Sequence, residues 1–568
     1  MASATLVAVP ASAQFFPEEV DHGSAAEADL VLLNGEVYTP NGWMQAVAVD
    51  NGAIIATGSA EDVSDFIGAS TETVDLQGAA VFPGLHDLHV HAIGGGLEQQ
   101  SCTFRSGATP DEIRTSIAGC VADAEPGEWI RGGNWIAAVF EPGQQTREFL
   151  DAVAPDNPVI LSDESHHSLW ANSAAIEAAG VNAQTPDPES GIIDRDAAGR
   201  PTGVFRETAT ALVSAAMPPT SEEAMLEGLH YAADLMSSFG ITSFTDAGLT
   251  KGSLAIMSEA SASGLMKQRT RGCIRWAGSP PDARAQAEAL IAMRPLYRTE
   301  RFDPDCVKIV LDGVPTESHT AAMLDHYVGS GESGMTIVSD EILFPAVTEF
   351  DRQGLHVKFH AAGDSAVRQA IDAVAAARAA NGFGGPAHDV GHNSFVSPED
   401  IARVPQLAMA WEFSPYIWYP SPITRDIVAA VGEERMERWI PVADAIAAGG
   451  LAGPGSDWSV VPSINPWLAI ETLVTRQEPG GSEDTLGEGQ KISLEQAIAM
   501  FTSNAAQIME HRQLVGSIEP GMMADLVVVE RNPFKVPENE IHNTKVVMTF
   551  IEGEKVYDAA SPPPSLSN

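Results

Sequence analysis

The sequence places histidines and an aspartate at the ends of short apolar runs, and these are residue types that bind a divalent metal. His89 and His91 close the run VFPGLHDLHVH, His360 ends GLHVKFH, His392 ends HDVGH, and Asp457 lies in AGPGSDW. Side chains two residues apart in a strand point to the same face, so the first pair can chelate one ion. Any one of these residues alone fits a structural role. The five together favour a zinc-type site, because Zn²⁺ accepts imidazole and carboxylate ligands.

The elements around these residues must bring their strand ends together. Helical patterns such as EEAMLEGLHYAADLMSSFG and SAVRQAIDAVAAARAANG separate the apolar runs, and this alternation is typical of a parallel sheet. The expected strands are 81–91, 241–247, 269–276, 306–312, 355–361, 387–393, 407–413 and 450–457. The pattern predicts an α/β fold, a (β/α)₈ TIM barrel, whose active sites form at the carboxyl ends of the strands.

The remaining segments predict three further parts. Runs such as ADLVLLNGEVYTP near one end and GMMADLVVVERNPF near the other read as hairpins, so residues 28–82 and 510–557 are expected to form one small β-sandwich. Residues 83–509 then form the barrel domain. The stretch from about 95 to 220 breaks the strand–helix alternation and is interpreted as a cap inserted after the first strand. Residues 1–27 are expected to be a leader.

Composition limits the partners. Lys and Arg total 32 against 77 Asp and Glu, a net charge of −45, which repels nucleic acid and anionic membranes. No apolar run is long enough to span a bilayer. Residues 1–13 resemble the end of a secretory signal, which favours a periplasmic or secreted location over a cytoplasmic one, although no basic residue precedes them. The four cysteines are interpreted as small buried apolar residues and not as a disulfide scaffold.

The motifs resemble a known family. PGLHDLHVH resembles the PGxxDxHxH signature of the amidohydrolase superfamily, and HSLWANSAAIEAAG, GITSFTDAG, FHAAGDSAV, GSDW and LVGSIEPGMMADLVVVE are similar to its amidohydrolase 3, YtcJ-like branch. That branch includes N-substituted formamide deformylases. The resemblance keeps its order over residues 28–557. Gly391 departs from it, since many relatives carry Glu before the strand 6 histidine, and Trp458-Ser459 replaces a common Ala-Pro pair.

The resemblance implies roles for individual residues. It implies one or two divalent ions, with Zn²⁺ favoured, held by the ligand set His89, His91, His360, His392 and Asp457. Lys308 in VKIVLDG falls where many relatives carry a carboxylated lysine that bridges two metals, or is an ordinary lysine at the barrel rim. His167 matches a cap histidine that reaches the scissile group, or serves as a structural hydrogen-bond partner within the cap. Glu207 matches a family acid that contacts substrate, or is a charge at a helix start.

Aromatic residues suggest the substrate. Trp135, Trp411 and Trp458 fall near predicted barrel-mouth loops and are expected to wall a pocket for an apolar or aromatic group, although each alone is also compatible with packing. A carboxylate on the substrate would instead require an arginine, for which Arg131 and Arg206 are the nearest cap candidates.

The expected reaction is hydrolysis of a C–N amide, N-formyl or carbamate bond in a small molecule by metal-activated water, with Asp457 moving the proton and His167 steadying the oxyanion. An ester, lactone or cyclic amidine on the same metal is the first alternative. A non-catalytic amidohydrolase-like scaffold is the second. The oligomeric state stays open, with a homodimer as one candidate.

Overall fold

An eight-stranded parallel sheet forms the centre of the molecule. The computed structural model describes residues 27–566 apart from 100, 106, 142, 165–166, 279, 317, 418 and 462, so the expected leader lies outside it except for residue 27. The barrel strands, in chain order and in spatial order, are β8 (Leu85–Val90), β15 (Ile241–Leu249), β16 (Arg269–Trp276), β17 (Phe302–Val310), β18 (His356–Ala361), β19 (Asp389–His392), β20 (Ala410–Phe413) and β21 (Leu451–Pro454). All eight expected strands are therefore confirmed, and the fold is a barrel.

The barrel closes between its first and last strands. Residues 90 and 458 form a parallel bridge, and the backbone N–H of Asp457 donates to the carbonyl of His89 at 2.7 Å. The run expected as one strand, 81–91, is divided into β7 (Ala80–Pro83) and β8. Gly84 separates them at a close approach, where a Cβ would lie 2.2 Å from Oγ1 of Thr242. The chain thus leaves another sheet and enters the barrel at this glycine.

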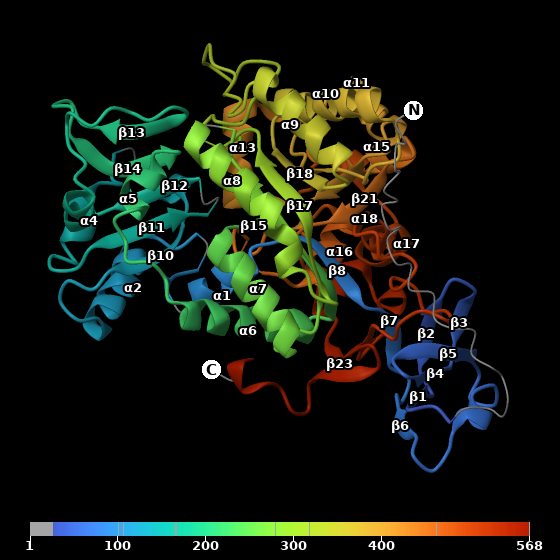
Figure 1. Cartoon of the computed structure of the whole chain (residues 1–568). Coiled ribbons are helices and arrows are strands. Elements are labelled where there is room, and N and C mark those ends of the chain that lie inside the picture. Colours follow the sequence, from blue (N-terminus) through green and yellow to red (C-terminus); the bar gives the residue numbers. More distant parts are fainter. Residues whose placement is uncertain are drawn as a thin grey trace, which may run out of the picture.

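Helices cover the outside of the barrel (Figure 1). They are α1 (Ala92–Gln99), α6 (Glu222–Ser238), α7 (Lys251–Ser263), α8 (Pro281–Met293), α9 (Asp340–Arg352), α10 (Asp364–Asn381), α11 (Pro398–Ile401), α12 (Arg403–Gln406), α13 (Pro422–Val431), α14 (Glu433–Met436), α15 (Val442–Ala447), α16 (Pro466–Thr475), α17 (Leu494–Ala499) and α18 (Ala505–Ile508). The Ser221 side chain caps α6 by accepting from the N–H of Ala224, and Gly240 with φ 83° follows its end.

Within the described part of the chain, no helix combines the length and apolar character needed to cross a bilayer.

The segment between β8 and β15 builds a separate layer beside the barrel (Figure 1). Its six-stranded sheet has the order β13-β14-β12-β11-β10-β9. The elements are β9 (Cys102–Thr103), α2 (Pro110–Asp123), β10 (Ile130–Trp135), α3 (Arg147–Asp151), β11 (Val159–Asp163), β12 (Ser168–Ala171), α4 (Ser173–Ala178), β13 (Gly191–Arg195), β14 (Pro201–Glu207) and α5 (Thr210–Ser214). This layer, called the cap below, has its own apolar core, which includes Ile113, Leu161 and Trp170.

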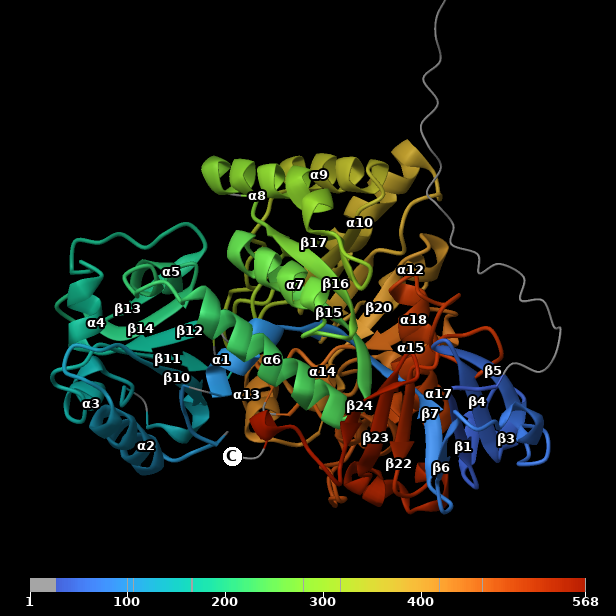
Figure 2. The same ribbon diagram turned by 60° about the horizontal axis from the view of Figure 1, so that its bottom comes forward.

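The two ends of the chain share sheets. Figure 2 shows β7 beside the C-terminal strands. One sheet has the order β24-β23-β22-β7-β2-β3 and the other the order β5-β4-β1-β6. Leu32, Val47, Leu526 and Phe550 are buried in one apolar cluster between them. The strands are β1 (Leu30–Leu33), β2 (Glu36–Thr39), β3 (Gly42–Met44), β4 (Ala46–Asp50), β5 (Ala53–Gly58), β6 (Glu72–Asp75), β22 (Leu526–Val529), β23 (Val546–Ile551) and β24 (Glu554–Asp558).

The cysteine interpretation is wrong. The structure pairs all four, as Cys102–Cys120 in the cap and Cys273–Cys306 in the barrel. The second pair joins residues that are direct partners in β16 and β17. The sequence separations of the two pairs, 18 and 33 residues, do not indicate this pairing. Cys102 of β9 meets Cys120 of α2 within the cap, and Cys273 meets Cys306 because β16 and β17 are neighbouring strands.

Candidate metal centre

The mouth of the barrel gathers four imidazoles. His89 belongs to β8, His91 follows it, and His360 and His392 lie at the ends of β18 and β19. The ring centroids of His89 and His392 are 4.8 Å apart, those of His360 and His392 are 4.2 Å apart, and those of His89 and His91 are 5.6 Å apart. The parallel strands thus place side chains that are up to 303 residues apart in sequence at one edge, as the barrel predicts.

Asp457 lies among these rings. Its Oδ1 is 3.3 Å from Nε2 of His91 and 3.4 Å from Nε2 of His89, and its Oδ2 is 3.8 Å from Nδ1 of His392. One ligand atom from each of His89, His392 and Asp457 lies within 4.8 Å of the others. The sequence-predicted ligands therefore meet in space, with His360 beside the ring of His392.

The chemistry of this group fits a metal ion. Burial lowers the pKa values of His89, His360 and His392 well below the usual value for histidine, so the imidazoles are neutral, as metal ligands must be. Nε2 of His392 is buried and has no hydrogen-bond partner among the described residues. A buried nitrogen without a partner is costly unless a ligand completes it. Neutral imidazoles with one carboxylate are a donor set suited to Zn²⁺.

Lys308 also lies in this group. Its Nζ is 3.1 Å from Nε2 of His89, and burial, followed by the charge of Lys358, lowers the pKa of Lys308 to about 8. Carboxylation requires a neutral amine, and desolvation raises the neutral fraction. Its position is therefore compatible with the bridging role that the resemblance implies.

We expect Lys308 to be carboxylated when the protein is loaded with metal. Nuclear magnetic resonance after exchange with ¹³C-bicarbonate should then show a carbamate signal that is absent from Lys308→Met. Buried Lys358 is the internal control, because Asp389 lies 2.9 Å from its Nζ and its ion pairs keep that amine charged. Full metal occupancy without a carbamate signal would contradict the expectation and indicate a single-ion site.

Glu412 is a positioning residue that sequence reasoning missed. Nδ1 of His89 donates to its Oε2 at 2.7 Å, and Nζ of Lys358 lies 3.2 Å from the same oxygen. Since Nδ1 is held by the carboxylate, Nε2 of His89 is the nitrogen that faces Asp457. The alternation of side chains along β20 could have indicated this role. Trp411 and Glu412 are consecutive, so only one of them can face the inside of the barrel.

The structure explains why glycine precedes His392. A Cβ on Gly391 would lie 2.4 Å from Oε2 of Glu412 and 3.0 Å from the carbonyl of Phe359. The carboxylate of Glu412 occupies the space into which a larger residue at 391 would project. This departure from the family pattern is thus linked to the contact that orients His89.

Gly391→Ala is expected to destabilise the protein by about 1–3 kcal/mol through overpacking. It should also weaken metal binding by about 10-fold, because Glu412 cannot move away without releasing His89. Thermal unfolding and a metal titration test both effects. Gly119→Ala in α2 is the matched control, since nothing lies within 4 Å of a Cβ there. Equal stability and metal affinity of the two variants would contradict the argument.

The cap contributes one histidine to the same place. The ring centroid of His167 is 5.3 Å from that of His360, and Nδ1 of His167 lies 2.8 Å from Oε2 of Glu207. Oγ1 of Thr320 donates to the other oxygen of Glu207 at 2.6 Å. Burial opposes the charged form of His167, but Glu207 outweighs it and raises the pKa of His167. The structure thus brings the two cap candidates into contact and sets them beside the barrel histidines.

The tryptophans are placed differently. Trp135 is 1% exposed in the cap core, where its Nε1 donates to the carbonyl of Leu161. Trp411, also 1% exposed, points away from the side on which Glu412 contacts His89, and it stacks on Phe413. Trp458 is 2% exposed and follows Asp457 directly. Packing accounts for Trp135 and Trp411, and Trp458 packs too, with its ring against Gly95 of α1, but it directly adjoins Asp457.

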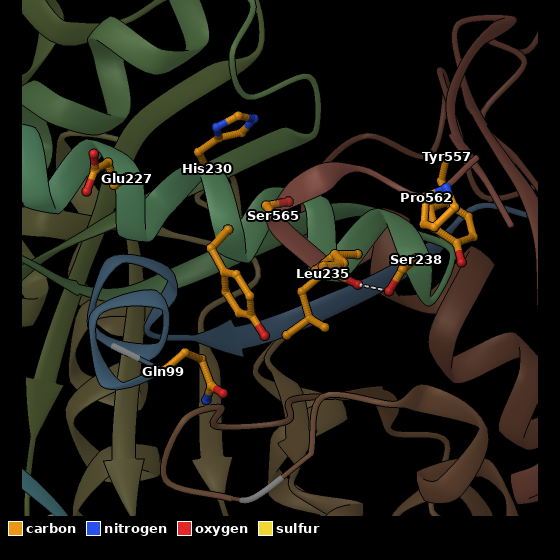
Figure 3. Close-up of a pocket in the computed structure, with 10 residues that line it drawn as sticks. Gln99, Glu227, His230, Leu235, Ser238, Tyr557, Pro562 and Ser565 are labelled. Carbon is orange, nitrogen blue, oxygen red and sulfur yellow. Dashed lines mark hydrogen bonds between the residues drawn. The ribbon is translucent and has the colours of Figure 1, made fainter. Parts of the chain in front are cut away.

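A cavity of about 730 Å³ lies elsewhere, between α6, β24 and the C-terminal segment (Figure 3). His230 and Tyr231 from α6, Tyr557 from β24 and Leu566 line it. Oγ of Ser565 donates to Asp234 and helps to seat the end of the chain on α6. None of the predicted site residues borders this cavity, so ligand geometry, and not cavity size, locates the candidate site.

A parallel eight-stranded barrel with histidines and an aspartate gathered at its carboxyl edge is typical of metal-dependent hydrolases. The model of the amidohydrolase family matches residues 72–557, and the chain therefore belongs to that family. The chain is 28% identical to the putative amidohydrolase YtcJ of Bacillus subtilis, over 90% of this chain and 96% of that one. It is 27% identical to the N-substituted formamide deformylase of Arthrobacter pascens, over 93% and 98%. An uncharacterized metal-dependent hydrolase of Pyrococcus horikoshii shares the fold, with a TM-score of 0.71, 22% identity and coverage of 90% and 99%.

Proposed function

We propose that this protein hydrolyses a C–N bond of amide type, in an amide, N-formyl or carbamate group of a small molecule. The observation that carries the proposal is the position of Asp457, within 3.3–3.8 Å of three imidazoles at the barrel mouth, with His167 beside them from the cap. Similarity to a relative named as an N-substituted formamide deformylase supports this choice of bond.

His89, His91, His360 and His392, with Asp457 and carboxylated Lys308, would hold the ion, and Zn²⁺ is the proposed metal. When bound, such an ion lowers the pKa of a water molecule toward neutrality and polarises the substrate carbonyl. Asp457 accepts the proton of the attacking water on its carboxylate and delivers it to the departing nitrogen. Glu412 keeps His89 oriented through Nδ1, at 2.7 Å.

His167 and Glu207 form the proposed carbonyl-facing side of the site. Glu207 lies 2.8 Å from Nδ1 and raises the pKa of His167 against the effect of burial, which favours an imidazole that can donate. A positioned donor stabilises the negative charge that develops on the carbonyl oxygen. Trp458 beside Asp457 is the proposed contact for an apolar part of the substrate.

A matched pair of substrates tests the bond type. Metal-loaded protein is assayed with N-benzylformamide and benzyl formate, which differ in the scissile nitrogen or oxygen, and with N-acetyl amines. Release of amine from the formamide or an acetamide is the expected result. Cleavage of the ester alone would favour the ester alternative, and full metal content with no turnover of any compound would favour the scaffold alternative.

A further inference from the structure

Arg275 points into the barrel beside Lys308. It is the penultimate residue of β16, and it pairs with Lys308 in the register of β16 and β17. Paired residues of neighbouring parallel strands project to the same face, and Lys308 reaches His89 inside the barrel. The next residue, Trp276, projects outward and packs edge-on against Phe350 of α9, with the two ring centroids 5.8 Å apart. Arg275 therefore faces inward at the mouth end of its strand.

The Arg275 side chain is accessible at the mouth of the barrel. It is exposed, whereas its neighbours Ile274 and Trp276 are buried. Protein nevertheless surrounds it closely enough that burial lowers the pKa of its guanidinium. Burial is the main cause of the lowered pKa of His360, and the charge of Arg275 contributes to it. Lys308 pairs in turn with Lys358 of β18, two residues before His360, so the side chains of Arg275 and His360 lie on the same inner face of the barrel.

No carboxylate neutralises Arg275 among the residues that the structure describes, and no hydrogen bond to it is formed there. The two other arginines of β16 are engaged: Arg269 lies 3.3 Å from Asp525, and Arg271 donates to the carbonyl of Ile508 at 2.9 Å. This contrast occurs in a chain with 77 acidic residues and only 32 basic ones. An accessible guanidinium without a carboxylate partner in the protein is available to bind an anionic group of a ligand.

The cap arginines considered from the sequence are engaged as well. Both terminal nitrogens of Arg131 donate to Oγ1 of Thr220, at 3.2 and 3.3 Å. Arg206 donates to both carboxylate oxygens of Asp194, at 3.1 and 3.2 Å, and to Ser318 at 3.0 Å. Arg275 is thus better placed than either to receive an anion from a substrate.

We propose that Arg275 binds a carboxylate of the substrate, so that the substrate class is an amide of an amino acid nitrogen, such as an N-acyl or N-formyl amino acid. The planar guanidinium offers parallel donors that match a carboxylate, and one positive charge balances one such anion. Arg275 is one strand spacing from Lys308, about 4.8 Å, which places the carboxylate close to the scissile bond. This inference rests on the proposed C–N hydrolase function and specifies its substrate.

The test uses pairs of compounds that differ only in the carboxylate, such as N-acetylphenylalanine and N-acetylphenethylamine, with their N-formyl equivalents. For each pair, the ratio of kcat/KM for the charged to the neutral compound is measured with metal-loaded protein. The wild type is expected to prefer the charged member. Arg275→Met should lower the ratio by about 10- to 100-fold, mainly through KM, and Arg275→Lys should restore part of it. Arg131→Met is the matched control and should keep the wild-type ratio.

A ratio that is unchanged in Arg275→Met, or a wild type that prefers the neutral members of all pairs, would overturn the inference. Loss of metal from Arg275→Met would also overturn it, because the arginine would then support the metal centre instead of the substrate.

Calorimetry of the same compounds separates this inference from the proposed function. If no compound is hydrolysed, tighter binding of the charged members that disappears in Arg275→Met supports the inference while the hydrolase proposal fails. Equal binding of charged and neutral members overturns the inference as well. Hydrolysis of amides without any dependence on the carboxylate leaves the hydrolase proposal intact and rejects the role of Arg275.

Discussion

Asp457→Asn is expected to lower kcat by about 10²–10⁴-fold, the range of general acid–base catalysis. The amide keeps one oxygen near His89 and His91, from which Oδ1 is now 3.4 and 3.3 Å away, but it cannot accept a proton. Metal content should therefore stay near the wild-type value while turnover is lost. Single-turnover kinetics and elemental analysis of the same preparation measure the two quantities.

Asp444→Asn provides the control for this substitution. Asp444 lies on α15, where it pairs with Arg438 at 2.7 Å and contacts none of the mouth histidines. Its turnover should match that of the wild type. A loss of metal in Asp457→Asn that parallels the loss of kcat would show that Asp457 serves only as a ligand, and the proton-transfer role would have to be given to another group.

The double variant His89→Ala, His392→Ala should lose metal and activity together. These residues supply two of the three closest ligand atoms, which all lie within 4.8 Å of one another. Removal of a residue that only hydrogen-bonds to a metal ligand already lowers metal affinity by about 10–100-fold. Removal of two ligands should therefore lower metal affinity by more than that. Elemental analysis after dialysis, together with the proposed amide assay, measures the result.

His230→Ala is the matched control for the double variant, because His230 lies on α6 with a side chain that is 52% exposed and pairs with Asp234. It should retain the wild-type metal content. Full metal occupancy in the double histidine variant would reject the assignment of the metal centre.

The strand-end histidines could be predicted because two signals in the sequence coincide. Each lies at the end of an apolar run of strand length, and in a parallel barrel all such ends meet at one edge. His89 and His91 add the two-residue period of a strand. The order of the barrel strands follows the order of the chain, so no long-range pairing had to be guessed to bring Asp457 back to His89.

The orientation of side chains within those strands could not be predicted in the same way. Strands of a parallel barrel are buried on both faces and read as nearly continuous apolar runs, so the sequence does not reveal which alternate residues face inward. For this reason the sequence predicts a pocket position for Trp411, although Glu412 is the residue that reaches His89. For the same reason the sequence does not indicate that Arg275 faces inward beside Lys308.

The barrel and the family could be recognised from the sequence, because each depends on the local period of apolar residues or on a short motif. The cysteine pairs, the fit of Glu412 against Gly391, the burial of Trp135 and the inward position of Arg275 follow from the folded structure alone. These depend on which side chains of distant segments share a face and how much space lies between them. These contacts between distant segments form only when the sheet closes and the cap packs beside it.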